Sequence, residues 1–320
     1  MEQLHVRTPL IESVPLSKLS GFKVYLKLEN TQPSGSFKLR GLGHHCVKAI
    51  KRGCKHLVCS SGGNAGMAVA YVGRCLRVPV TIVVPETTSK EAISRIKDEE
   101  ANVLVHGKFW DEANEFAKEI ISTGKVENGT LIHPFDEPEV WEGHKTMIDE
   151  VKEQLNTTPD LVVLSVGGGG LMNGVLEGMH EAGWSHVPLL AMETIGADSF
   201  AASVNAGKIV TLPGITSVAM CLGAVTVCET SFHWTFRHKI ISHVIEDVEA
   251  VNACLRFLDD HKFLVQPACG AALASVYANS IKKLQEQKKL DDVKTVVIIV
   301  CGGQGISLQQ LLALKTKFNL

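Results

Sequence analysis

The stretch Asp160-Leu161-Val162-Val163-Leu164-Ser165-Val166-Gly167-Gly168-Gly169-Gly170 decides the fold of this 320-residue chain. Its first half is an uninterrupted apolar run, which predicts a strand buried on both faces. Four glycines follow, and a segment with helical periodicity starts directly after them. Bare backbone N–H groups at the start of a helix favour an anion, above all a phosphate. The stretch therefore predicts a parallel α/β sheet with a phosphate-binding turn at the carboxyl end of this strand.

The same alternation of apolar runs and helical segments continues along the whole chain. Further strands are expected at Val24–Leu28, His56–Ser60, Val80–Val84, Ala101–Val105, Leu189–Glu193 and Val293–Val300. Helices are expected at Asn64–Arg77, Asp111–Ser122, Glu139–Leu155, Leu171–Ala182, Val248–Asp260 and Gly270–Gln287. Buried strands separated by helices indicate an α/β protein whose mostly parallel sheets are flanked by helices.

Composition excludes several function classes. The formal net charge of −2 provides no overall basic field for nucleic acid or an anionic membrane. No apolar run approaches the roughly 20 residues of a membrane span, and the first residues lack the pattern of a signal peptide. Nine cysteines without a Cys-x-x-Cys pair are typical of reduced thiols. We expect a cytoplasmic protein with a small-molecule substrate and neither a nucleic-acid nor a membrane partner.

Lys38 is the strongest candidate for a functional residue, because a lysine is unfavourable at its predicted position. A helix is expected from Ser36 to Arg52, capped by Ser34 or Ser36. Lys38 then lies in the first turn, where the positive end of the helix dipole disfavours an ammonium group. Such a lysine is biased toward the free amine, which attacks carbonyls and forms Schiff bases. The alternative is an ordinary surface lysine that bends into water.

Two more glycine-rich segments follow predicted strands. Ser60–Gly66 offers hydroxyls, backbone N–H groups and an amide at a helix start, which suits a carboxylate. Cys301 and the glycines after it end an apolar strand, so this thiol is either a buried filler or a neutral hydrogen-bond partner for a ligand. Ligands of open α/β sheets bind beyond the carboxyl ends of the strands. A dehydrogenase remains a rival because Glu193 ends a strand, although neither nucleotide-binding glycine motif occurs.

With these segments in order, the chain resembles the serine/threonine dehydratases, which are fold type II (tryptophan synthase β-like) pyridoxal-phosphate enzymes. The matching segments are Pro33–Lys38, Ser60–Gly66, Ser165–Leu171 and Cys301–Gly303, and the likeness covers nearly the whole chain. Within the family it resembles the animal serine dehydratase and serine dehydratase-like group. The resemblance implies a lyase of amino-acid catabolism that feeds gluconeogenesis, acts in the cytoplasm and forms a homodimer, with a monomer as the alternative.

The resemblance also implies roles for individual residues. Lys38 carries the cofactor as a Schiff base and is the catalytic residue, and Cys301 faces the pyridine nitrogen. The implied cofactor contacts are Phe37, Lys38, Asn64, Gly167, Gly168, Gly169, Gly170, Leu171 and Cys301. The implied substrate contacts are Ser61, Gly62, Gly63, Asn64, Ala65 and Cys221. A monovalent cation, chemically suited to K⁺, is implied at Gly167, Glu193, Ala197, Leu222 and Ala224.

The family fold is two-lobed, with the cofactor in the cleft between the lobes. The implied large domain comprises residues 1–31 and 136–320, and residues 32–135 form the small domain that carries Lys38. The implied reaction is α,β-elimination of L-serine or L-threonine to pyruvate or 2-oxobutyrate plus ammonia. A β-replacing synthase, an amino-acid racemase and a catalytically weak ligand-binding protein are the alternatives. The chain departs from the family at Gln266, where a glutamate is usual, and at Gly62 and Cys221 beside the expected pocket.

Overall fold

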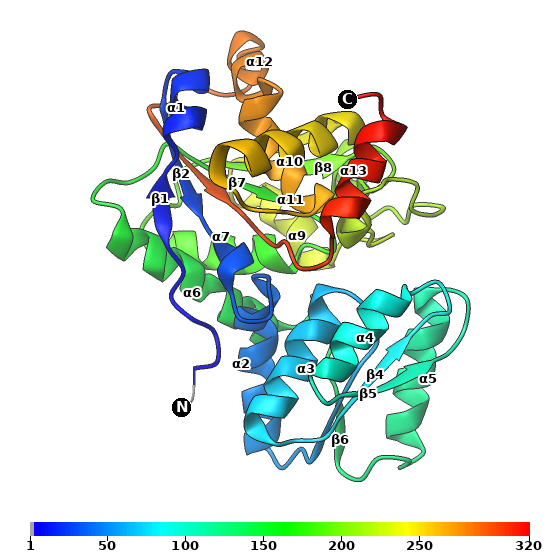
Figure 1. Ribbon diagram of the computed structural model, residues 1–320. Helices are drawn as coiled ribbons and strands as arrows, with labels where there is room; N and C mark the ends of the chain where they lie inside the picture. The colour runs from blue at the N-terminus through cyan, green and yellow to red at the C-terminus, as the bar shows by residue number, and fades with distance from the viewer. Residues whose placement is uncertain (1–2) are drawn as a thin grey trace. The chain divides into compact units, whose positions relative to one another are not determined.

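The computed structural model describes residues 3–320, which form two compact units (Figure 1). The first unit comprises residues 3–6 and 32–144, and the second comprises residues 7–31 and 145–320. This division differs from the expected one, because residues 3–6 and 136–144 lie with the segment that carries Lys38. The backbone of Val6 exchanges two hydrogen bonds with the Gln32 amide. Glu139 binds Arg52 and lies 2.8 Å from the Nδ1 atom of His45.

The first unit is a four-stranded parallel sheet covered by helices on both faces. Its strand order is β5-β4-β3-β6. The strands are β3 (His56–Cys59), β4 (Val80–Val84), β5 (Asn102–Val105) and β6 (Gly129–Leu131). The helices are α2 (Lys38–Lys51), α3 (Asn64–Leu76), α4 (Lys90–Asp98) and α5 (Trp110–Ser122), followed by the start of α6 (Pro138–Gln154). Figure 1 shows α3 and α4 on one face of this sheet and α5 on the other.

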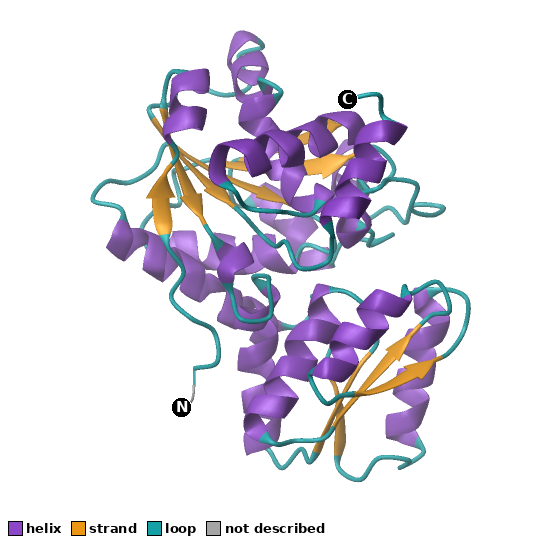
Figure 2. Cartoon of the chain, in the orientation of Figure 1, coloured by secondary structure: helices purple, strands orange, loops and turns teal. Residues whose placement is uncertain are grey.

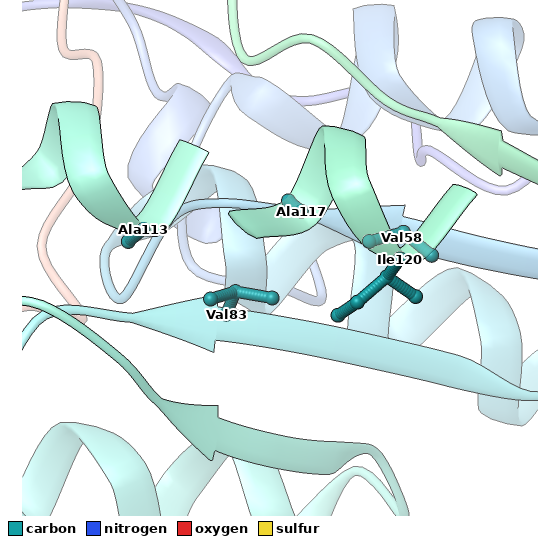
Figure 3. Close-up of a cluster of buried hydrophobic side chains, with 5 residues drawn as sticks. All are labelled: Val58, Val83, Ala113, Ala117 and Ile120. Atoms are coloured by element: carbon teal, nitrogen blue, oxygen red, sulfur yellow. The ribbon is translucent and has the colours of Figure 1, made fainter. Parts of the chain in front are cut away.

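Successive side chains of these strands point to opposite faces of the sheet, so the unit has a packed core on each face. Figure 3 shows Val58 of β3 and Val83 of β4 clustered with Ala113, Ala117 and Ile120 of α5. All five side chains are buried. The alternate residue Ile82 points to the other face, where it lies beside α3 at Gly66. The small alanines let α5 approach the sheet closely, and this fixes the carboxyl ends of β3 and β4 beneath the loops that follow them.

The second unit is a six-stranded sheet of order β1-β2-β10-β7-β8-β9 (Figure 2). The strands are β1 (Leu10–Glu12), β2 (Lys23–Lys27), β7 (Leu161–Ser165), β8 (Leu189–Thr194), β9 (Ile240–Ile245) and β10 (Thr295–Ile299). Only the edge strand β1 is antiparallel among them. The helices are α1 (Val14–Ser20), α7 (Gly170–Glu181), α8 (Ser199–Ala206), α9 (Glu229–His233), α10 (Asp247–His261), α11 (Pro267–Tyr277), α12 (Ser280–Glu286) and α13 (Leu308–Lys317). Three 3₁₀ turns also lie in the second unit among the described residues, at Glu29–Thr31, Met220–Leu222 and Trp234–Phe236.

The α/β class and the seven predicted strands agree with the structure, whereas one predicted helix is wrong. The segment expected as a single helix at Gly270–Gln287 forms α11 and α12, which meet at Asn279. Asn279 has a φ of 58°, in the left-handed region that asparagine tolerates better than most residues. A continuous helix cannot pass through that conformation. All eleven residues of α11 are buried, as expected of a central helix that packs on β7 and β8.

A buried ion pair lies in the second unit where β2 ends. The Nζ atom of Lys27 donates to Glu150 Oε2 at 2.5 Å, to the Thr8 carbonyl at 2.8 Å and to Gln154 Oε1 at 2.9 Å. Lys27 is fully buried and Glu150 is 8% exposed. The lysine therefore satisfies three acceptors in a place from which water is excluded.

In the part of the chain that the structure describes, every helix is too short or too polar to cross a membrane.

Candidate active site

Lys38 lies in the first turn of α2, as the sequence predicts, but the helix begins at Lys38 rather than at Ser36, and the predicted serine cap is wrong. The helix is capped by Phe37 without a side-chain hydrogen bond. Phe37 has helical dihedral angles, and neither serine hydroxyl accepts a hydrogen bond from an N–H group of the first turn. The hydroxyls of Ser34 and Ser36 are buried without a hydrogen-bond partner among residues 3–320. The start of α2 consequently keeps its positive potential, and Lys38 lies within it.

The Lys38 amine is held by a backbone carbonyl and two aromatic rings. Its Nζ atom donates to the Pro134 carbonyl at 2.6 Å. It lies 5.3 Å from the ring centroid of Phe37 and 5.9 Å from that of Phe135. A carbonyl orients an amine without neutralising it as a carboxylate would. This environment fixes the nitrogen of Lys38 while leaving its lone pair available for chemistry once the proton is lost.

Two histidines that feel the charge of Lys38, His133 and His144, are neutral at physiological pH. Burial, followed by the positive charge of Lys38, lowers the pKa of His133 to about 4. Burial, followed by the charges of Lys38 and Arg40, lowers the pKa of His144 well below its usual value. The ring of His144 lies 4.9 Å from that of Phe37. Lys38 is therefore the group on this side of the unit that is best placed to accept a proton.

The loop between β3 and α3 was predicted to bind an anion, and its geometry is compatible with that prediction. Ser61 Oγ accepts a hydrogen bond from the Gly63 N–H group, and α3 begins at Asn64 without a side-chain cap. Ser60 donates to Asn114 Oδ1 at 2.7 Å and so anchors the loop to α5. A helix of thirteen residues thus presents its amino terminus beside a hydroxyl, which suits a carboxylate.

Gly62 is required by close packing against a residue that sequence reasoning missed. A Cβ atom at Gly62 would lie 2.6 Å from Thr88 Cγ2 and 3.3 Å from Val84 Cγ1. We expect Gly62→Ala to displace the loop and to lower kcat/KM by about 10–100-fold, since small displacements of a binding group are costly. The double variant Gly62→Ala/Thr88→Ala should recover most of this loss in a steady-state assay. Gly62→Ala/Thr87→Ala is the matched control, and recovery in that exposed-residue variant would contradict the packing explanation.

The four-glycine turn of the second unit leads directly from β7 into α7. Gly169 caps α7 in the left-handed conformation with a φ of 93° and without a side-chain hydrogen bond. A Cβ atom at Gly169 would lie 1.9 Å from Ser231 Oγ, so no other residue fits there. The turn leaves the amino terminus of a twelve-residue helix for an anion. These features fit a phosphate group.

Cys301 lies directly beyond β10 among polar but uncharged partners. Its Sγ atom is 3.6 Å from Ser165 Oγ, and the Cys269 thiol is hydrogen-bonded to it. Burial and then Cys301 raise the pKa of Cys269 well above its usual value. These neighbours make the Cys301 site suitable for a neutral aromatic nitrogen and unsuitable for a cationic one.

Glu193 is a fully buried carboxylate in β8. It accepts hydrogen bonds from the N–H groups of Phe200 and Ala201 at the start of α8, at 2.9 and 2.8 Å. Burial nevertheless raises its pKa to about 8. Within residues 3–320, Glu193 forms no ion pair. Two of the predicted cation-site residues are adjacent, because a Cβ atom at Gly167 would lie 2.9 Å from Leu222 Cα and 3.2 Å from its carbonyl oxygen.

The predicted site residues divide between the two units. The first unit holds Phe37, Lys38, Ser61, Gly62, Gly63, Asn64 and Ala65. The second unit holds Gly167, Gly168, Gly169, Gly170, Leu171, Glu193, Ala197, Cys221, Leu222, Ala224 and Cys301. Sequence reasoning missed Pro134, whose carbonyl binds Lys38, as well as His144 and Thr88. No local spacing signals these contacts, because each partner comes from another part of the chain.

Comparison with known proteins decides the family. The family model described as pyridoxal-phosphate dependent enzyme matches residues 1–302. The chain belongs to this family.

Individual proteins of known name are similar to this chain over nearly its whole length. The chain is 53% identical to a rat protein named serine dehydratase-like, over 99% of this chain and 96% of that protein. It is 52% identical to mouse L-serine dehydratase/L-threonine deaminase, over 100% and 97% of the two chains. The solved L-serine ammonia-lyase of Rhizomucor miehei has a TM-score of 0.92 and 36% identity, covering 99% of this chain and 100% of that one. Maize serine racemase has a TM-score of 0.87 and 26% identity, covering 98% and 92%.

Proposed function

We propose that this enzyme catalyses the pyridoxal-phosphate-dependent α,β-elimination of L-serine or L-threonine, which yields pyruvate or 2-oxobutyrate plus ammonia. One observation carries the proposal: the amine of Lys38 is held by the Pro134 carbonyl at the start of α2, with neutral histidines around it. The likeness to proteins named serine dehydratase and L-serine ammonia-lyase supports the choice of reaction.

Separate sets of residues would bind the cofactor, bind the substrate and transfer the proton. Bound pyridoxal phosphate supplies the electron sink that stabilises negative charge at the substrate Cα atom. Phe37, Lys38 and Asn64 of the first unit and Gly167–Leu171 with Cys301 of the second would hold it. Ser61, Gly62, Gly63, Asn64 and Ala65 would receive the substrate carboxylate at the start of α3, with Cys221 beside the substrate. The Lys38 amine takes the α-proton, and the Pro134 carbonyl keeps its nitrogen oriented.

An absorption spectrum of the purified protein tests the proposal. We expect a visible band that shifts on addition of L-serine, together with formation of a 2-oxo acid and ammonia in equal amounts. L-Threonine is assayed in parallel, because the two substrates differ by one methyl group, a difference worth only about 1–3 kcal/mol in binding. A protein without a visible band, or one whose band shifts without 2-oxo acid, would contradict the proposal.

Racemisation is the second candidate, because two solved serine racemases share the fold at 26% identity. A racemase must in addition return a proton to the opposite face of the Cα atom, a step that elimination does not require. Chiral analysis of residual serine, with and without an added thiol, separates elimination from racemisation and from β-replacement.

The proposal includes a monovalent cation, with K⁺ as the chemically suited ion. Its ligands would be Glu193 and the backbone carbonyls of Gly167, Ala197, Leu222 and Ala224. The buried Glu193 carboxylate and the adjacency of Gly167 and Leu222 support this site. Oxygen-only ligands suit such an ion.

Removal of the cation should therefore lower both stability and activity. We expect Tm in KCl to exceed Tm in N-methylglucamine chloride at equal ionic strength, because a bound ion stabilises the folded state. Glu193→Gln should abolish that difference. Asp198→Asn, which changes a nearby carboxylate, is the matched control and should retain the difference. An equal Tm in both salts for the unaltered protein would contradict the site.

The proposal extends to compartment, assembly and metabolic role. All nine cysteines are free thiols, which is the state that a reducing compartment such as the cytoplasm maintains. A homodimer is proposed, and light scattering of the purified protein distinguishes it from a monomer. Pyruvate formed from serine would place the enzyme in amino-acid catabolism and would supply carbon for gluconeogenesis.

A further inference from the structure

Three buried polar side chains lie directly behind the four-glycine turn. Asn173 of α7, Cys228 at the cap of α9 and Ser231 of α9 are 0%, 4% and 0% exposed. Ser231 Oγ donates to Asn173 Oδ1 at 2.8 Å, and Asn173 Nδ2 donates to Cys228 Sγ at 3.2 Å. Cys228 Sγ lies 3.0 Å from Ser231 Oγ. The three side chains therefore form a closed ring of hydrogen bonds.

The direction of the ring follows from its members. The Ser231 proton is committed to the Asn173 carbonyl oxygen, so the remaining contact requires the Cys228 thiol to donate to Ser231 Oγ. Each member then donates once and accepts once around the ring. Hydrogen bonds arranged in this way polarise one another, and buried networks that are fully satisfied are rigid.

The ring contacts the turn at two points. The backbone N–H group of Cys228 donates to the Gly168 carbonyl at 3.1 Å. Ser231 Oγ occupies the space into which a Cβ atom at Gly169 would project. The residues of the ring thus hold Gly168 by a backbone hydrogen bond and Gly169 by packing.

We propose that Asn173, Cys228 and Ser231 are positioning residues that hold the four-glycine turn in the conformation that binds the cofactor phosphate. The proposal rests on the proposed function, because it assigns the phosphate to this turn. The proposal predicts a selective effect. Disruption of the ring should weaken the binding of a ligand that carries the phosphate, and it should not change the binding of one that has only the aldehyde and the pyridine ring.

The experiment compares two ligands on cofactor-free full-length protein. Pyridoxal phosphate and pyridoxal, which lacks the phosphate, are titrated and binding is followed by absorbance. Ser231→Ala and Cys228→Val should each weaken pyridoxal phosphate binding by about tenfold or more, since each removes part of a buried network. The affinity for pyridoxal should stay within about twofold of the unaltered protein. Cys228→Ser can donate and accept in place of the thiol and should restore most of the lost affinity.

Ser13→Ala is the matched control. Ser13 is fully buried in the same unit, caps α1 through Leu16 and lies at the amino end of β2, whereas the glycine turn follows the carboxyl end of β7. Its loss should leave both affinities unchanged. Equal weakening of both ligands in the ring variants, or no weakening of either, would overturn the proposal. If the unaltered protein binds neither ligand, the proposed function itself fails. Cys228→Val provides the same comparison if Ser231→Ala does not fold.

Discussion

Lys38→Ala is expected to fold and to lose turnover by at least about 10²–10⁴-fold, because general acid–base catalysis by a positioned side chain contributes that much. The substitution removes the amine that the Pro134 carbonyl and the rings of Phe37 and Phe135 orient. It should also remove the visible chromophore that borohydride reduces onto the protein. The measurements are 2-oxo acid production from L-serine and mass analysis of the protein after reduction.

The matched control is Lys51→Ala on the same helix. Lys51 is exposed in the last turn of α2, where a cation is favourable to the helix dipole and distant from the first turn. This variant should retain both the chromophore and turnover. Pyruvate formation by Lys38→Ala at an undiminished rate would exclude Lys38 as the proton acceptor.

Lys27→Met is expected to lower the free energy of unfolding by about 3–5 kcal/mol, the usual cost of leaving one member of a buried ion pair unpaired. Methionine fills nearly the same volume but removes the ammonium group that donates to Glu150 Oε2 and Gln154 Oε1. Urea unfolding followed by circular dichroism measures the loss. Lys23→Met, at the exposed start of the same strand, should change stability by no more than about 0.5 kcal/mol.

A double-mutant cycle separates the ion pair from the packing of the lysine stem. Lys27→Met/Glu150→Gln keeps an acceptor for the Thr8 N–H group and removes the buried negative charge. We expect the double variant to recover a substantial part of the stability that Lys27→Met loses. Additive losses in the two single variants would show that Lys27 stabilises the unit by packing alone.

The sequence predicts best where an interaction is local. The apolar run ending at Val166 and the glycines after it predicted both the strand and the start of α7, because both depend on neighbouring residues. The same holds for the start of α3 at Asn64. Lys38 was placed correctly in its helix, but its serine cap was wrong because Phe37 had already entered the helix.

Contacts between distant segments were missed for a physical reason. Asn173 is 55 residues before Cys228 and 58 before Ser231, so no periodicity links them. The ion pair of Lys27 was also missed. Lys27 lies in an otherwise apolar strand, and the sequence pattern does not show that the carboxylate of Glu150 pairs with it. Tertiary packing determines which of these polar residues meet, and no local sequence pattern indicates the pairing.

The position of β10 between β2 and β7 has a consequence for synthesis of the chain on the ribosome. β2 is made early, yet Val24 must wait for Val296 before it gains its parallel neighbour. Residues 32–144 carry the whole of the smaller sheet and emerge long before that pairing is possible. Long-range pairing of this kind slows folding and leaves apolar strands exposed to aggregation. Nascent chains should therefore acquire protease resistance in the smaller unit first and in the larger sheet only after β10 has emerged from the ribosome.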